Sequence, residues 1–291
     1  MDINKDIILF IADNREKQLK IKNDFQDLFL QVFQKSLDDI QWEHFYLNCP
    51  YGQTVSFAYY HKNIMIAHGG LIPQQLISKG GSTVDYFLQT AVMVSKEFQN
   101  LALFKNLMDN MDRYTEECGR FSLAFPNKNT FMPFVKMLGW NPVREYSIIQ
   151  YKVVDRDDTC LTSGQGPEYE TFEYDLDLGS KFVLWRGELN KLFESANDEY
   201  KIIFKDHEGS LEVMYASLCR KGGFIPISKI AAESGFQSVN LPECYLGIIS
   251  LENLQREKEV GIAQKMCFYP FQVNNLSYES IKPSLLLSDV F

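Results

Sequence analysis

The segment between Val94 and Phe104 has the residue types and the setting to bind a phosphate group. It follows an apolar run typical of a strand and precedes apolar spacing typical of a helix, so it joins a strand to a helix start. The first N–H groups of a helix lack partners within it and carry a partial positive charge, which favours a pyrophosphate. Ala102 has the smallest side chain of this turn and would let a ligand approach the backbone closely. A plain connector is the alternative interpretation, because every strand–helix turn offers such a helix start.

Histidines and cysteines are sparse and widely spaced in this sequence. None of the four histidines, His44, His61, His68 and His207, stands three or four residues from another histidine or from a cysteine. Zinc sites use closely spaced ligands of these types, so we expect no metal site. No Ser–His or Cys–His arrangement for covalent catalysis is visible either. The six cysteines form no closely spaced pair, which indicates the reduced thiols of a cytoplasmic protein.

The composition is that of a globular protein. The 291 residues are 45% hydrophobic and 23% charged, and 22 Phe, 15 Tyr and 3 Trp can build a large core. No apolar run approaches the roughly 20 residues that span a bilayer and no signal peptide is visible, so we expect no membrane partner. The formal net charge of −9 argues against a nucleic-acid partner, since phosphate contacts need a basic surface.

Apolar periodicity predicts a mixed order of strands and helices in the first half. Strands are expected at 7–11, 55–60, 64–66, 71–78, 84–94, 121–125 and 147–154. Helices are expected around 25–33, 104–114 and 131–138, the last capped by Asn129 or Thr130 and ended by Gly139. The second half has weaker patterns, with plausible strands at 211–218, 247–250 and 266–271.

A cluster of charged residues, Gly, Ser and Pro at 155–169 predicts a linker. We therefore expect one domain at 1–154 and another at 170–291.

Three parts of the first half resemble the GNAT superfamily of N-acyltransferases. Where that family has a pyrophosphate loop with the pattern Q/R-x-x-G-x-G/A, this chain has 99–104, with Gln99 matching and with Ala102 and Phe104 in place of the small residues. The segments 125–130 with 134–140, and 42–52 with 68–73, resemble one branch of the family. That branch includes enzymes that acylate dTDP-linked 3-amino-3,6-dideoxyhexoses for surface polysaccharides such as the O-antigen of lipopolysaccharide.

The resemblance implies an α/β (α+β) chain with the GNAT fold. Its sheet would be mixed, mostly antiparallel and splayed, and a second, degenerate GNAT-like domain would follow it. Acyl-CoA would be the co-substrate, with an acyl carrier protein as the alternative donor.

The resemblance also implies where the donor binds. Backbone groups of Met93 and Val94 would hold the pantetheine arm, and an N–H there would stabilise the oxyanion of the tetrahedral intermediate. Asn127 and Asn129 would hydrogen-bond the arm or the leaving group, although both also suit a turn and a helix cap. The pyrophosphate would lie on the backbone N–H groups of Gln99, Asn100, Leu101, Ala102 and Leu103.

The acceptor implied by the resemblance is the amine of a nucleotide-linked amino sugar, which must lose a proton to attack the thioester. Candidate bases are His68, which titrates near neutrality, and Asp85, at the start of the central strand. His68 can instead make a structural hydrogen bond, and Asp85 can be solvated or contact a sugar hydroxyl. The position at which many family members have an acidic Tyr holds Phe134 or Val135, so we assign no protein general acid.

Contacts to the acceptor are expected from Tyr86, Trp185 and Arg186, with a structural role as the simpler interpretation of the last two. The second half shows no further pyrophosphate turn, so we expect one donor site per chain. Two other functions stay open. One is a tandem-GNAT aminoacyltransferase that uses aminoacyl-tRNA, which the acidic charge disfavours. The other is a non-catalytic acyl-CoA-binding protein, which Ala102, Phe104 and the missing Tyr allow.

Overall fold

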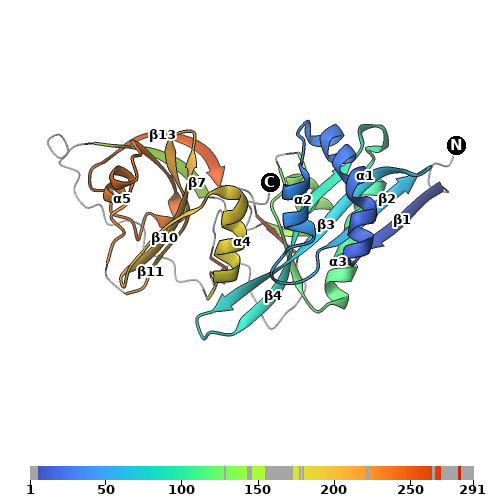
Figure 1. Ribbon diagram of the computed structural model, residues 1–291, viewed down its shortest axis with the longest axis horizontal. Coiled ribbons are helices and arrows are strands. Elements are labelled where there is room, and N and C mark those ends of the chain that lie inside the picture. Colours follow the sequence, from blue (N-terminus) through green and yellow to red (C-terminus); the bar gives the residue numbers. More distant parts are fainter. Residues whose placement is uncertain are drawn as a thin grey trace.

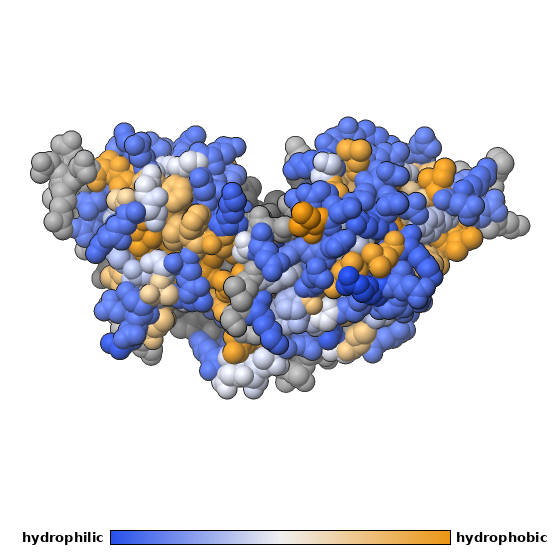
Figure 2. Space-filling view, viewed as in Figure 1, coloured by the Kyte–Doolittle hydropathy of each residue, from blue (hydrophilic) through white to orange (hydrophobic). Residues whose placement is uncertain are grey.

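The computed structural model of this chain describes residues 6–127, 129–142, 146–154, 173–176, 178, 180–220, 223–263, 266–269 and 281–282. Its strands form two sheets in two lobes, and helix α4 (Ser180–Asn190) lies between them (Figure 1). On the face drawn in Figure 2, a notch separates the lobes and polar residues cover most of the surface. Within these ranges no helix combines the length and the apolar character needed to cross a membrane.

The first sheet has eight strands and is mostly antiparallel. Its spatial order is β1 (Ile7–Ala12), β2 (Val55–His61), β3 (Ile64–Ser78), β4 (Thr83–Val94), β5 (Phe121–Ala124), β14 (Cys267–Phe268) and β6 (Asn141–Pro142), with β8 (Tyr174–Leu176) paired to β3. β4 and β5 run parallel, and the other described pairs are antiparallel. This pattern confirms the expected mixed α/β architecture.

Helices cover both faces of the first sheet. Besides α4, the α-helices among the described residues are α1 (Arg15–Phe33), α2 (Asp39–Tyr46) and α3 (Leu101–Glu117) in the first lobe and α5 (Ile227–Glu233) in the second. α1 and α2 bury Phe25 and Trp42 on one face, and α3 buries Leu107 on the other. Because successive strand residues point to opposite faces, Leu88 of β4 joins the first core and Phe87 the second.

The second sheet contains a strand that we expected in the first. Its spatial order is β13 (Leu254–Ala263), β7 (Tyr146–Val153), β12 (Ser238–Pro242), β11 (Ser210–Leu218), β10 (Tyr200–His207) and β9 (Phe193–Ala196). The strand predicted at 147–154 is β7, and it pairs with β12 and β13 instead of closing the first sheet. Periodicity identifies a strand but leaves its partner open, because the ladder bonds form with residues far along the chain.

The other expectations for the second half have mixed outcomes. The strand at 211–218 is confirmed as β11. Of the segment 266–271, the described residues 266–269 contribute the short β14, which lies in the first sheet. The segment 247–250 is a turn with one bridge from Ile249 to Ile225. The linker expected at 155–169 lies outside the described residues, and the division into two domains stays a prediction.

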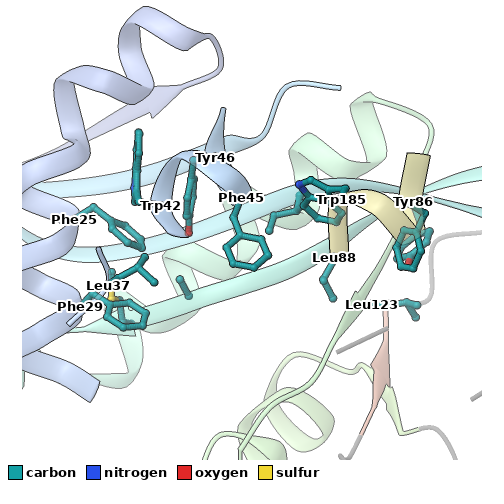
Figure 3. Close-up of a cluster of buried hydrophobic side chains, with 14 of the residues drawn as sticks. Phe25, Phe29, Leu37, Trp42, Phe45, Tyr46, Tyr86, Leu88, Leu123 and Trp185 are labelled. Carbon is teal, nitrogen blue, oxygen red and sulfur yellow. The ribbon is translucent and has the colours of Figure 1, made fainter. Parts of the chain in front are cut away.

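One of the hydrophobic clusters, here called the shared core, contains residues from both lobes. Trp185 of α4 packs edge-on against Phe45 of α2, with ring centroids 5.8 Å apart, and Figure 3 shows this pair in line with Tyr86 and Leu88 of β4. Met214 of β11 belongs to the same cluster. Lys282 adds a buried polar link, since its Nζ lies 3.1 Å from Asp175 of β8 and over the ring of Tyr215 in β11.

Local signals in the first half are largely confirmed. The strands predicted at 55–60 and 64–66 pair as a hairpin between β2 and β3, with Lys62 and Asn63 both at positive φ as a type I′ turn requires. Gly139 has a φ of 72° after the helical turn Pro133–Met137, as expected for a residue that ends a helix. The strands predicted at 64–66 and 71–78 are wrong as separate elements, because β3 runs unbroken through both glycines between them.

Candidate functional site

β4 and β5, two central strands of the first sheet, diverge toward the C-terminal end of β4. The parallel pairing of β4 with β5 runs from Tyr86–Phe121 to Gln89–Ala124. Beyond that last pair, β4 continues to Val94, whereas the chain after β5 turns at Pro126. The backbone of the last residues of β4 is thus left without β5 as a neighbour in the described part of the chain.

A bulge reshapes β4 at the same point. His68 pairs with Met93 and Gly70 pairs with Thr90, so Ala91 and Val92 together face Gly69 alone. Ala91 has a φ of 45°, in the left-handed region that residues other than Gly rarely adopt.

A pocket of about 510 Å³ opens between the parting strands. The end of α1, the end of β4, the start of α3 and the segment after β5 all contribute to its wall. Its lining residues are Val32, Phe33, Val92, Met93, Val94, Gln99, Asn100, Leu101, Phe104, Asn127, Asn129, Thr130 and Pro133. Seven of the nine residues expected to hold the donor are among them, and Ala102 and Leu103 are not.

Asn100 sets the start of α3 at this pocket. Its side-chain oxygen accepts a 2.7 Å hydrogen bond from the Leu103 N–H, and its extended backbone makes it the N-cap. The Leu103 N–H, one of those expected to bind a pyrophosphate, is therefore already bonded. The first turn of the helix still faces the pocket through Leu101, whose side chain is 62% exposed.

The two asparagines after β5 have different roles. Asn127 accepts hydrogen bonds from the N–H groups of Asn129, at 2.9 Å, and of Thr130, at 3.2 Å. It begins the following helical turn, so the cap is Asn127 and the prediction of Asn129 or Thr130 as cap is wrong. Both asparagines are exposed at the pocket wall, where Asn129 can reach a bound ligand.

Neither candidate base is placed to take a proton from a substrate in this pocket. His68 is completely buried under α1, with its Nδ1 3.0 Å from the Ala91 carbonyl oxygen, and burial lowers its pKa to about 4. Asp85 is half-exposed near the other end of β4, bonded to Gln75 at 2.8 Å and to Arg120 at 3.3 Å. It lies nine residues before Val94, roughly 30 Å along the strand.

The three residues expected to contact an acceptor lie in the shared core. Tyr86 and Arg186 are each 1% exposed, and the Tyr86 ring stacks on Phe121. Trp185 stacks on His44 of α2 and donates from Nε1 to the His44 carbonyl at 3.2 Å. These contacts of Trp185 join α4 to the first lobe, and the Arg186 guanidinium lies over the Trp185 ring, 5.0 Å from its centroid. The structural interpretation therefore fits both residues.

A buried carboxyl group near the site was missed in the sequence. Asp112 of α3 is 6% exposed and accepts hydrogen bonds from Gln89 Nε2, at 3.0 Å, and from Trp140 Nε1, at 3.3 Å. Burial raises its pKa to about 7, because the apolar surroundings disfavour the charged form. The signal was present, since Asp112 stands four residues after Met108 and so on the buried face of the helix.

Comparison with known proteins rests on structure alone, because no protein-family model and no curated protein matches this sequence. A probable N-acyltransferase of unknown function from Enterococcus faecalis aligns over 90% of this chain and 72% of its own, with a TM-score of 0.61 and 12% identity. A GCN5-related N-acetyltransferase from Anabaena variabilis aligns over the same shares of the two chains, with a TM-score of 0.59 and 11% identity. A GCN5-related N-acetyltransferase from Kribbella flavida aligns over 90% of this chain and 71% of its own, with a TM-score of 0.56 and 14% identity. The chain has the GNAT fold.

The comparisons show the fold of this chain and leave the chemistry of its pocket open. At 11–14% identity the likeness concerns the fold alone. In this chain the end of β4, beyond its pairing with β5, lines one side of the pocket, and the start of α3 lines another.

Proposed function

We propose that this protein transfers an acyl group from acyl-CoA to a primary amine. The pocket between β4 and β5 carries the proposal, because it combines the two surfaces that a CoA thioester needs. The backbone of Met93 and Val94, which line the pocket beyond the last pairing with β5, can pair with the amides of a pantetheine arm, as an added strand pairs with a sheet edge. The start of α3 at Gln99 and Leu101 offers positive potential for the pyrophosphate.

The chemistry needs no covalent enzyme intermediate. The amine nitrogen attacks the thioester carbon, a C–N bond forms, and the C–S bond breaks as the CoA thiolate leaves. A backbone N–H at Val94 would stabilise the negative charge that develops on the carbonyl oxygen. The proton of the amine passes to water in this proposal, because His68 is buried and Asp85 is distant.

The amine of a nucleotide-linked amino sugar, dTDP-linked in the branch that the sequence resembles, is the acceptor that we propose. Its support is the resemblance of the segments 125–130 and 134–140, since the three residues expected to contact it lie in the core. A cytoplasmic location belongs to the same proposal.

Titration calorimetry of the protein with CoA tests the donor site. We expect one site per chain, weakened by Leu101→Asp. A carboxylate about 8 Å from a phosphate charge costs roughly 2 kcal/mol, or about 30-fold in affinity. An acidic residue in the first turn suits a helix and Leu101 is exposed, so the variant should fold.

Ile40→Asp is the matched control. Ile40 is also exposed, at 73%, and also lies in the first turn of a helix, but it does not line the pocket. Equal CoA affinity for both variants, or no binding by the wild type, would overturn the donor site.

Release of free thiol from acyl-CoA in the presence of dTDP-amino sugars then tests turnover. CoA binding without thiol release with any amine would indicate a binding protein. Salt-dependent binding of tRNA would favour the aminoacyltransferase.

A further inference from the structure

A side chain from the neighbouring strand is hydrogen-bonded to the bulge in β4. His68 of β3 lies with Nδ1 3.0 Å from the carbonyl oxygen of Ala91, the residue at positive φ. A carbonyl oxygen only accepts hydrogen bonds, so Nδ1 must carry the proton and donate. The bond thus restrains the peptide group that follows Ala91, which is the first one leading to the pocket wall.

The imidazole is fixed in place and sealed from solvent. Its exposed fraction is zero, and the ring of Phe25 from α1 meets it edge-on with centroids 4.6 Å apart. Its other nitrogen, Nε2, is buried and has no hydrogen-bond partner in the described part of the chain. The low pKa caused by burial keeps the ring neutral near pH 7, so the tautomer that donates to Ala91 persists.

Ala91 immediately precedes the part of β4 that lines the pocket. Val92, Met93 and Val94 all contribute to the pocket wall. Rotation of the Ala91–Val92 peptide would change the direction of the backbone N–H and C=O groups that follow it. Nothing at Ala91 itself favours this conformation, because a Cβ disfavours positive φ.

We propose that His68 is a positioning residue for acyl transfer: its Nδ1–H holds the Ala91 carbonyl and thereby fixes the β4 backbone that lines the pocket. This inference rests on the proposed function and replaces the expected role of His68 as general base. The residue acts through the strand and touches neither the donor nor the acceptor.

Two substitutions separate this role from simple packing. His68→Asn keeps an N–H donor close to the place of Nδ1, whereas His68→Leu fills similar space without a donor. We expect His68→Leu to lower kcat at least tenfold while KM for acyl-CoA stays within about threefold, because the start of α3 still holds the pyrophosphate. We expect His68→Asn to keep at least a third of the wild-type kcat.

A general base would give a different result, since asparagine cannot take a proton and both variants would lose activity alike. Unchanged kcat in His68→Leu, or equal losses in both variants, overturns the proposal. If His68→Leu does not fold, His68→Gln takes its place, because a glutamine amide lies nearer the position of Nε2 than that of Nδ1.

Hydrogen exchange followed by mass spectrometry gives a readout that is independent of turnover. Peptides containing 91–94 should exchange faster in His68→Leu than in the wild type and in His68→Asn, while α5 in the second lobe keeps its protection. Equal exchange in all three proteins contradicts the role in the bulge. A wild type that does not bind CoA contradicts the proposed function instead.

Discussion

The buried carboxyl of Asp112 predicts that folding stability falls as the pH rises from about 4 to 7. Its pKa is about 7 in the folded protein and 3.8 in an unperturbed chain. The folded state therefore binds the Asp112 proton more tightly than the unfolded state does. The stabilisation that this gives the folded state is complete below about pH 4 and is lost as the pH rises through 7. A difference of this size corresponds to roughly 4 kcal/mol of unfolding free energy.

Asp112→Asn removes this titration and keeps the hydrogen bonds. An asparagine can accept from Trp140 Nε1 and, once the Gln89 amide turns over, donate to Gln89 Oε1, a buried atom without a partner in the described structure. We expect wild type and variant to be equally stable at pH 4 within about 1 kcal/mol. By pH 8 the variant should be more stable by several kcal/mol.

Urea denaturation at half-unit pH steps measures this difference. Subtracting the two curves removes the titration of all other groups. Asp27→Asn, exposed on α1 and not among the charges that raise the pKa of Asp112, is the control and should leave the difference unchanged. A constant difference between wild type and Asp112→Asn from pH 4 to 8 would refute the reasoning, since it would show that Asp112 does not titrate in this range.

Two further substitutions test local features of the site. Asn100→Ala should cost about 1 kcal/mol in a thermal unfolding assay by removing the cap from the Leu103 N–H, and Asn100→Ser should restore most of it. Gly69→Ala should cost roughly 1–3 kcal/mol, because the added Cβ would overlap the Met111 sulfur. That cost should shrink in a Met111→Ala background, and an unchanged cost there would show that the overlap is not its cause.

Much of the candidate site could be predicted because its elements are local. The strand before Val94, the helix after Asn100 and the turn at Asn127 follow from periodicity and capping within about ten residues of chain. Val32 and Phe33 were missed as lining residues. Their apolar character predicted only that they lie on the buried face of a helix.

What only the tertiary structure decided is which groups meet and which lose contact with water. His68 had the residue type of a base, but burial under α1 and the bond to Ala91 make it a donor within the fold. Trp185 and Arg186 had residue types suited to ligand contact and are core residues between the lobes. β7 was predicted as a strand, yet its sheet depends on partners about 90 and 110 residues away. Periodicity and caps are encoded locally, whereas desolvation and strand partners arise from segments far apart in the sequence.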